Sequence, residues 1–211
     1  MNLQVIYISI VFLSFIVSII YYRNHPKYFF LLSALLLITF IVEATGYYML
    51  RNKIKHAFIF HFYAPIEFSI LSYLFYREIQ TSWIRKMILL VMPLFLIFST
   101  VNIFYLQKLK VYNSYGFIIK GVLVVCWILL FFYDLYNNDK FENPLRLPMF
   151  WISIGLLFFF SGTIFLNGYI EHLMKTNMDL ARKVFRINLS LNIFLYLCIS
   201  YGLTWKKIKQ T

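Results

Sequence analysis

The fold is decided by residues 28–50, which read YFFLLSALLLITFIVEATGYYML and carry one acidic or basic side chain, Glu43. A helix needs about 20 mostly apolar residues to cross about 30 Å of hydrocarbon. Six further runs approach that length, so the expected spans are residues 3–22, 28–50, 57–76, 87–106, 114–136, 149–170 and 184–204. We therefore predict an all-α polytopic membrane protein, with seven transmembrane helices in an antiparallel bundle.

The composition supports the membrane class. Of the 211 residues, 62% are hydrophobic and 13% are charged, whereas a soluble domain has about 45–50% apolar and about 25% charged residues. No hydrophilic stretch is long enough for a soluble domain, so residues 1–211 are expected to form a single transmembrane domain. Helices are expected rather than barrel strands, which would show alternating segments of about 10 residues.

The net charge of +12 does not indicate nucleic-acid binding. The basic residues cluster in short loops between apolar runs, as in Arg51, Lys53 and Lys55, and in the tail at Lys206, Lys207 and Lys209. Basic flanks of this kind contact anionic lipid headgroups and influence topology. Membrane lipids are therefore expected partners, and nucleic acid is not.

The basic residues in the loops bear on how the chain is oriented across the membrane, and their numbers on the two sides are similar. The loops on the side of the N-terminus carry eight basic residues, and those on the side of the C-terminus carry ten. The basic tail favours a cytoplasmic C-terminus and an N-terminus on the outer face. The first run lacks a basic segment before it and a small-residue cleavage pattern, so it is expected to be a span rather than a signal peptide.

Polar residues inside the runs gather in one half of the membrane. At about 1.5 Å per residue, the N-terminal-side half or the midplane holds Glu43, His61, Tyr63, Glu67, Asn102, Lys120, Ser161, Asn167, Asn188 and Asn192. The other half holds Asp134, which is expected to reach water at its helix end. The pattern predicts a polar pocket that opens on the N-terminal side, is lined by the second to seventh helices and has an apolar floor.

The charged members suggest how such a pocket binds a ligand. Ionisable groups at this depth are costly and usually face a bundle interior or a cavity. Glu43 and Glu67 would supply negative charge, Lys120 would pair with one of them or with an anionic group, and the ligand would be oriented by His61, Asn102, Asn188 and Asn192. The predicted ligand is a small molecule, a lipid headgroup or a cation, and no catalytic residue is assigned.

Structural explanations remain open at the same positions. Asn and Ser side chains in spans often form hydrogen bonds between helices. Lys120 can extend toward the interface. Either glutamate can be protonated and hydrogen-bonded for structure alone, and a buried Glu–Lys pair can also be purely structural.

Catalysis and transport are alternatives. A zinc hydrolase would need several histidine ligands, but His56 and His61 are five residues apart and His172 lies in or beside a predicted loop. A lysoplasmalogenase-like lipid hydrolase would use the paired acids Glu43 and Glu67, and a proton- or ion-coupled carrier would use the same Glu–Lys set. The two cysteines, Cys126 and Cys198, lie in apolar runs without metal spacing. No cofactor is expected.

Three motifs carry a family resemblance: Glu43-Ala44-Thr45-Gly46, the stretch HFYAPIEF at residues 61–68, and Phe150-Trp151 with Ser161-Gly162. Together they resemble uncharacterised seven-helix inner-membrane proteins of Bacteroidota-type bacteria, some of which precede a sensor histidine kinase. The resemblance implies a bacterial inner-membrane, sensor-like module with a cytoplasmic C-terminus. Because this chain ends at Thr211, it also implies that an output either passes through a signalling partner protein or is absent.

Overall fold

The structure is a computed structural model that describes residues 3–107, 109, 111–137 and 143–205, without the side chains of residues 167, 169–172, 174 and 175. Seven long helices dominate it: α1 (Leu3–Tyr21), α2 (Phe30–Arg51), α3 (Ala57–Glu78), α4 (Ser82–Val101), α5 (Ser114–Asn137), α6 (Pro148–Thr176) and α7 (Met178–Thr204). Each contains a segment long and apolar enough to cross a membrane. The predicted all-α, seven-helix class is confirmed, and the chain has the architecture of a multi-pass membrane protein.

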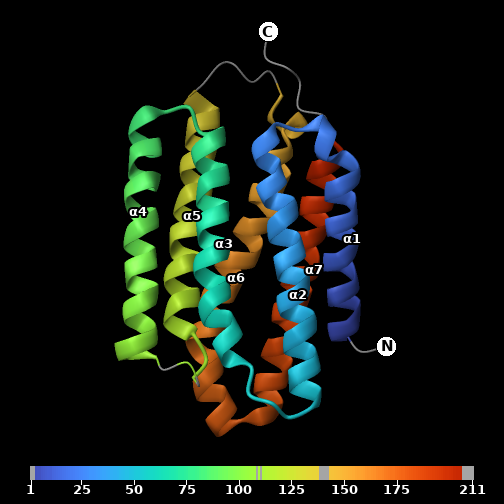
Figure 1. Cartoon of the computed structure of the whole chain (residues 1–211), viewed down its shortest axis with the longest axis vertical. Helices are drawn as coiled ribbons and strands as arrows, with labels where there is room; N and C mark the ends of the chain where they lie inside the picture. Colours follow the sequence, from blue (N-terminus) through green and yellow to red (C-terminus); the bar gives the residue numbers. More distant parts are fainter. Residues whose placement is uncertain (1–2, 108, 110, 138–142, 206–211) are drawn as a thin grey trace.

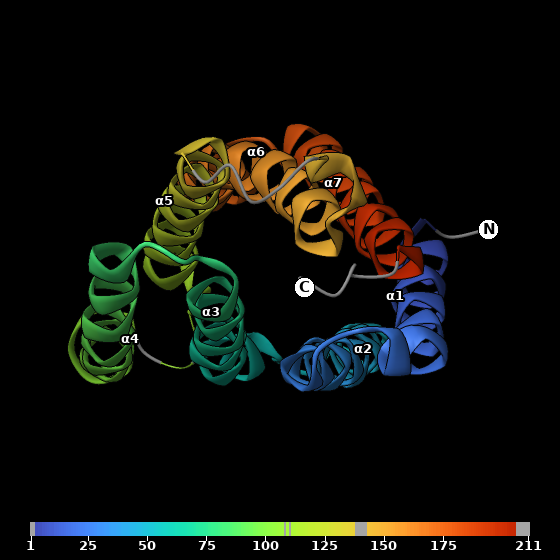
Figure 2. The ribbon, with the colours of Figure 1, turned by 90° about the horizontal axis from the view of Figure 1, so that it is seen from above.

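Six of the helices form a ring and α4 lies outside it. The helix contacts run from α1 to α2, α3, α5, α6 and α7, and α7 returns to α1. Seen along the bundle, α4 packs on α3 and α5 away from the centre (Figure 2). The N-terminus lies at the lower end of the bundle and the C-terminus at the upper end (Figure 1). The expectation that the second to seventh helices surround the pocket is corrected, because α1 replaces α4 in the ring.

The last two helices are longer than predicted. Residues 171–183 were expected to be a loop, but α6 continues to Thr176 and α7 begins at Met178. Asn177 separates them, and its side chain accepts a hydrogen bond from the backbone N–H of Leu180 at 3.0 Å. This is an N-cap, which stabilises a helix start. Hydropathy locates where a chain leaves the hydrocarbon, but a helix can continue into the interface beyond that point.

Small residues allow α6 and α7 to approach each other closely. A Cβ atom added to Gly155 would lie 2.7 Å from the Cβ of Cys198, and one added to Gly202 would lie 2.8 Å from the backbone oxygen of Pro148. Close backbone approach at small residues is a common way for helices to associate in membranes, where lipid is as apolar as a leucine side chain. These glycines therefore hold one side of the ring together.

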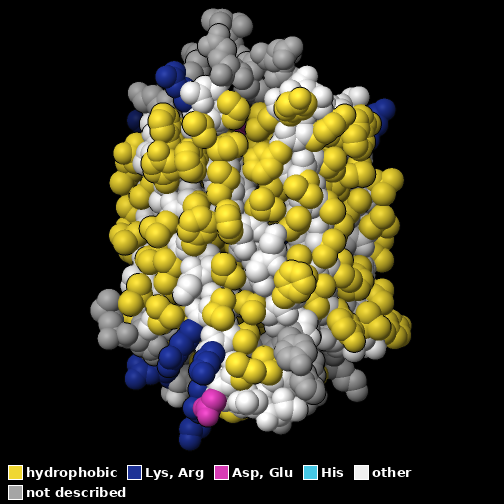
Figure 3. Space-filling model, turned by 180° about the vertical axis from the view of Figure 1, so that it is seen from behind, with side chains coloured by type: hydrophobic (Ala, Val, Ile, Leu, Met, Phe, Trp, Pro, Cys, Tyr) yellow, Lys and Arg dark blue, Asp and Glu magenta, His cyan; other side chains and the backbone are white. Residues whose placement is uncertain are grey.

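The outer surface suits a bilayer. Hydrophobic side chains cover the middle of the face seen in Figure 3, and Lys and Arg side chains lie near its two ends. The exposed hydrophobic residues include Leu89, Leu90 and Ile97 on α4, which turns part of its surface away from the ring. An apolar band between charged ends is the pattern that lipid contact favours.

The C-terminal-side half of the bundle is packed with buried side chains. Val11, Leu36, Phe75 and Trp127 belong to one buried apolar cluster, and the Trp127 indole donates a hydrogen bond to Ser72 at 3.2 Å. Asp134 was expected to reach water here, but it is 1% exposed. It is buried because it caps the turn between α3 and α4 rather than facing solvent.

Candidate functional site

A cavity of about 650 Å³ lies inside the ring at its N-terminal side. It extends from the exposed loop between α2 and α3 down to the tyrosine and carboxylate side chains near the middle of the bundle. Polar residues on its wall include Gln4, Tyr7, Thr39, Glu43, Tyr63, Glu67, Tyr112, Lys120, Thr163, Asn188, Asn192 and Tyr196. Phe60, Phe117, Phe159, Phe160 and Phe185 supply much of the apolar wall.

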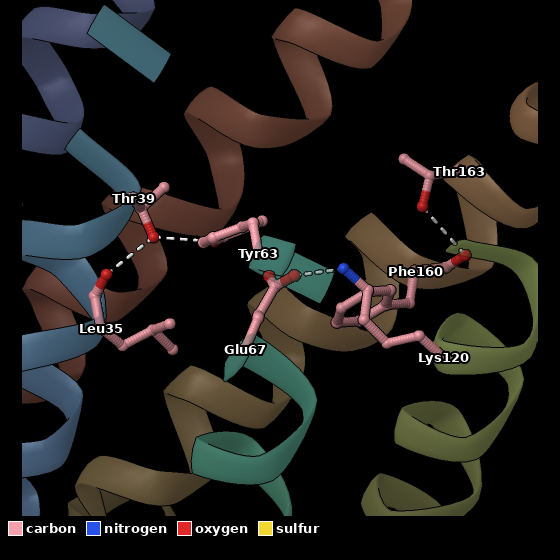
Figure 4. A network of polar contacts seen from close by, with 7 residues as sticks. All are labelled: Leu35, Thr39, Tyr63, Glu67, Lys120, Phe160 and Thr163. Atoms are coloured by element: carbon pink, nitrogen blue, oxygen red, sulfur yellow. Dashed lines mark hydrogen bonds and ion pairs between the residues drawn. The ribbon is translucent and has the colours of Figure 1, made fainter. Parts of the chain in front are cut away.

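Two polar contacts join the helices on one side of the cavity (Figure 4). The hydroxyl groups of Thr39 on α2 and Tyr63 on α3 lie 2.8 Å apart, and Thr39 also donates to the Leu35 carbonyl. One turn further along α3, Glu67 forms an ion pair with Lys120 of α5. Tyr63 and Glu67 share a face because residues four apart on a helix project in the same direction.

Aromatic rings surround the Lys120 ammonium. It lies 4.6 Å from the ring centroid of Phe117, 5.5 Å from that of Phe160 and 5.7 Å from that of Tyr63. A cation within about 6 Å of an aromatic face is attracted by the ring quadrupole. Lys120 is 2% exposed, so the carboxylate of Glu67 and these rings take the place of water around its charge.

Glu43 is in a different situation from Glu67. It lines the cavity on α2 and is half-buried, and none of the described basic side chains forms an ion pair with it. Its electrostatic neighbours are the hydroxyl of Tyr7 and the like-charged Glu67. The cavity therefore contains one carboxylate with an ammonium partner and one without a basic partner among the described residues.

Four tyrosines lie near Glu43. They are Tyr7, Tyr63, Tyr112 and Tyr196, and the rings of Tyr7 and Tyr196 are 6.0 Å apart. Tyr112 lies outside the spans, and burial, with a smaller contribution from Glu43, raises the pKa of its phenol above the ordinary value. Its hydroxyl is therefore protonated at neutral pH.

The mouth of the cavity consists of Lys53, Lys55 and His56, in the loop between α2 and α3. Lys53 has a positive φ of 58°, a conformation that non-glycine residues adopt infrequently and mostly in turns. The lysines and the histidine give the mouth a basic character, opposite to the carboxylates deeper inside.

Six of the eight predicted ligand-binding residues line this cavity: Glu43, Tyr63, Glu67, Lys120, Asn188 and Asn192. The last two lie one turn apart on α7. The amide nitrogen of Asn192 donates to the Asn188 side-chain oxygen at 2.7 Å and to its backbone oxygen at 3.0 Å. The structure thus brings together most of the set, and their role in binding stays a prediction.

His61 and Asn102 lie outside the cavity, contrary to expectation. His61 is 1% exposed, and its Nε2 atom lies 3.0 Å from the Val111 carbonyl. Asn102 begins a π-helical turn, residues Asn102–Leu106, that extends α4, and its amide donates to the side-chain oxygen of Asn113 at 2.8 Å. Both residues connect helices or loops outside the ring interior, so depth in the membrane was a poor guide to the direction in which they point.

Metal binding gains no geometric support in the part of the chain that the structure describes, where no group of three or more His, Cys, Asp or Glu is placed to hold an ion. His56, in the loop directly before α3, is at the mouth, whereas His61 on α3 is outside the cavity. The side chains of His172 and Asn167 lie outside the described residues, and Ser161 is half-buried without lining the cavity.

Several cavity residues did not stand out in the sequence. Tyr7, Tyr112, Phe117 and Phe160 were missed because the chain contains 17 Tyr and 24 Phe, so no single aromatic residue is conspicuous. Phe117 and Phe160 could have been sought in the sequence as neighbours of Lys120. A buried Lys in a span requires neighbours that stabilise an ammonium, and Phe117 lies on the same helix three residues before Lys120.

Water is expected to reach the cavity from the N-terminal side. In a background with Cys126→Ser and Cys198→Ala, a membrane-impermeant methanethiosulfonate reagent should modify Asn188→Cys at least about tenfold faster than Phe194→Cys, because thiolates form in water and not in lipid. Asn188 lines the cavity and Phe194 is exposed on the outer surface. The measurement is the modification rate in sealed vesicles.

Asn177→Cys, at the exposed junction of α6 and α7, serves as the sidedness control. Asn188→Cys should react from the same side of the membrane as this control. Reaction from the opposite side would contradict an opening at the N-terminal side.

Comparison with family models, with curated proteins and with solved structures finds no match to this chain. The chemistry of the cavity is therefore the main guide to function. Aromatic walls, a buried ion pair and a second carboxylate suit a site that binds a small polar or charged molecule.

Proposed function

We propose that the protein is a ligand-binding, sensor-like module of the membrane, and that a small molecule binds in the cavity on its N-terminal side. The observation that carries the proposal is Glu43, a carboxylate that faces a cavity inside a membrane bundle without a basic partner among the described residues. Buried ionisable groups in membrane proteins generally mark sites for ions, protons or ligands. The Glu67–Lys120 pair alone would have an adequate structural explanation.

The packing of the other half of the bundle favours binding over transport. The cavity reaches the loop between α2 and α3, whereas buried apolar side chains pack the C-terminal-side half. A carrier must open its site to both sides in turn, and a receptor needs access from one. This geometry supports a module that holds its ligand and, as the family resemblance suggests, acts through a partner protein.

A lipid hydrolase that uses a nucleophilic hydroxyl or thiol group has less support, whereas both acids of the alternative with paired carboxylates, Glu43 and Glu67, line the cavity. The described residues on the cavity wall include two threonines, Thr39 and Thr163, but no Ser or Cys. Nucleophilic catalysis also needs an adjacent base that activates the nucleophile. The Thr39 hydroxyl instead contacts Tyr63 and Leu35, and the Thr163 hydroxyl contacts the Phe160 carbonyl.

Filling the cavity is expected to remove a bound molecule. A Cβ atom at Gly46 would lie 3.8 Å from both the Phe60 and His56 side chains on the cavity wall, so the indole of Gly46→Trp would project into that space. Native mass spectrometry of the protein extracted from its own membranes should detect a small molecule on the wild type that is lost in this variant. Thr45→Trp is the matched control, because Thr45 is exposed on the neighbouring position of α2. Identical bound molecules in all three proteins would overturn the proposed function.

A further inference from the structure

We infer that the ligand carries an organic ammonium group and that the Glu43 carboxylate binds it. The inference rests on the proposed ligand-binding function and narrows it to a chemical class. It follows from the charges inside the cavity, from the surroundings of Lys120 and from the surroundings of Glu43.

The charges in the depth of the cavity do not balance. Glu43 and Glu67 contribute two carboxylates and Lys120 contributes one ammonium, which is engaged with Glu67. An ionised carboxylate that is only partly exposed to water is costly unless an opposite charge or several hydrogen bonds stabilise it. A ligand that brings a positive charge to Glu43 completes a second ion pair and makes this region neutral.

Lys120 shows that this cavity already accommodates an ammonium. Its charged nitrogen contacts the Glu67 carboxylate and lies within 6 Å of the ring centroids of Phe117, Phe160 and Tyr63. Such a combination of a carboxylate and aromatic faces recurs where proteins recognise ammonium groups.

The surroundings of Glu43 repeat these elements without the ammonium. Tyr7, Tyr112 and Tyr196 all lie within electrostatic range of its carboxylate. All three tyrosines line the cavity together with Glu43. The Glu43 side of the cavity is therefore a carboxylate–aromatic site of the same kind, in which a ligand occupies the position that a lysine occupies beside Glu67.

The mouth selects an organic cation over a metal ion. Lys53 and Lys55 border the opening, and their positive charges repel a small bare cation. A ligand with an apolar body gains from contact with the phenylalanines of the wall, which offsets that repulsion because burial of apolar surface contributes roughly 25 cal/mol per Å². The volume of about 650 Å³ leaves room for such a body.

Three probes with the same phenyl group and similar size test the charge preference: 3-phenylpropylammonium, 3-phenylpropanol and 3-phenylpropanoate. In isothermal titration calorimetry on the full chain in lipid nanodiscs, we expect the ammonium to bind at least about tenfold more tightly than the alcohol, because interactions with an ionised partner are stronger than neutral ones. The propanoate should bind most weakly. Glu43→Gln should abolish the preference for the ammonium, and Glu43→Asp, which keeps the charge, should retain part of it.

Glu78→Gln is the matched control, because Glu78 is a buried carboxylate at the other end of α3 that accepts a hydrogen bond from Tyr28 at 2.5 Å. It should leave all three affinities unchanged. Equal binding of the three probes, tighter binding of the propanoate, or an ammonium preference that survives in Glu43→Gln would each overturn the ammonium inference. None of these results affects the experiment with Gly46→Trp, which tests ligand binding itself.

Discussion

Replacing Lys120 with Met is expected to lower the free energy of unfolding by about 3–5 kcal/mol, because removing one partner of a buried ion pair leaves the other charge uncompensated. The side chains of Lys120 and Glu67 are 2% and 10% exposed, so water cannot replace the lost ammonium. The substitution keeps an unbranched apolar side chain that is one atom shorter than that of lysine. The measurement is equilibrium unfolding in mixed micelles, followed by circular dichroism while the fraction of denaturing detergent is raised.

The double variant Glu67→Gln with Lys120→Met should recover most of that loss, since neutral groups carry no uncompensated charge. Lys86→Met is the control, because Lys86 is exposed near the start of α4 and should change stability by less than about 0.5 kcal/mol. A Lys120→Met variant as stable as the wild type would show that the pair is not held away from water.

Much of the fold follows from hydropathy because lipid requires every backbone hydrogen bond to be made within a span. Seven apolar runs therefore predict seven helices, and the structure contains helices at all seven. Pairing of Lys120 with one of the two glutamates was among the predicted outcomes, because opposite charges at similar depth in a membrane each need a partner, and the structure pairs it with Glu67.

The position of α4 could not be predicted in the same way. Hydropathy and helical periodicity identify faces, but they do not identify which helix a face meets. Asn102 shared its depth with Glu43, yet its partner is Asn113 in the segment before α5. His61 likewise points to the backbone of Val111. Both residues were assigned to the pocket because all polar side chains in the same half of the membrane were assumed to face the inside of the helix bundle.

The structure was also required to show that Glu43 has no ion-pair partner among the described basic side chains. Sequence alone offered either glutamate as the partner of Lys120. The choice depends on α3 packing against α5, whereas α2 packs between α1 and α3. The same packing brings Tyr7 of α1 next to Glu43. α1 and α2 are consecutive in the chain, but the sequence is so rich in aromatic residues that it does not reveal which faces of the two helices meet.

The second large effect is expected at Asp134, at the opposite end of the bundle from the cavity mouth. Its carboxylate on α5 accepts hydrogen bonds from the backbone N–H groups of Gln80 and Thr81, both at 2.9 Å, and from the Thr81 hydroxyl at 2.5 Å. Thr81 directly precedes α4, which begins at Ser82. Asp134 of α5 thus caps the start of α4, a role that a side chain at the start of the same helix usually plays.

Asp134→Ala should lower the free energy of unfolding by about 2–3 kcal/mol, because a partly buried donor that loses its acceptor costs about 1–3 kcal/mol. Asp134→Asn, which keeps one carbonyl oxygen, should lose less. Asp179→Ala is the matched control, since Asp179 is exposed and its contact with Arg182 at 3.2 Å lies at the surface, where such pairs contribute little. The measurement is the same unfolding titration, combined with hydrogen exchange.

Exchange of the Gln80 and Thr81 amides should accelerate in Asp134→Ala, because these donors lose their acceptor. Probe binding in the cavity should be unchanged, because α4 lies outside the ring and contributes no residue to the cavity wall. Loss of probe binding in a folded Asp134→Ala protein would show that α4 supports the ring after all. Unchanged stability and exchange would mean that the described hydrogen bonds of Asp134 do not hold the start of α4.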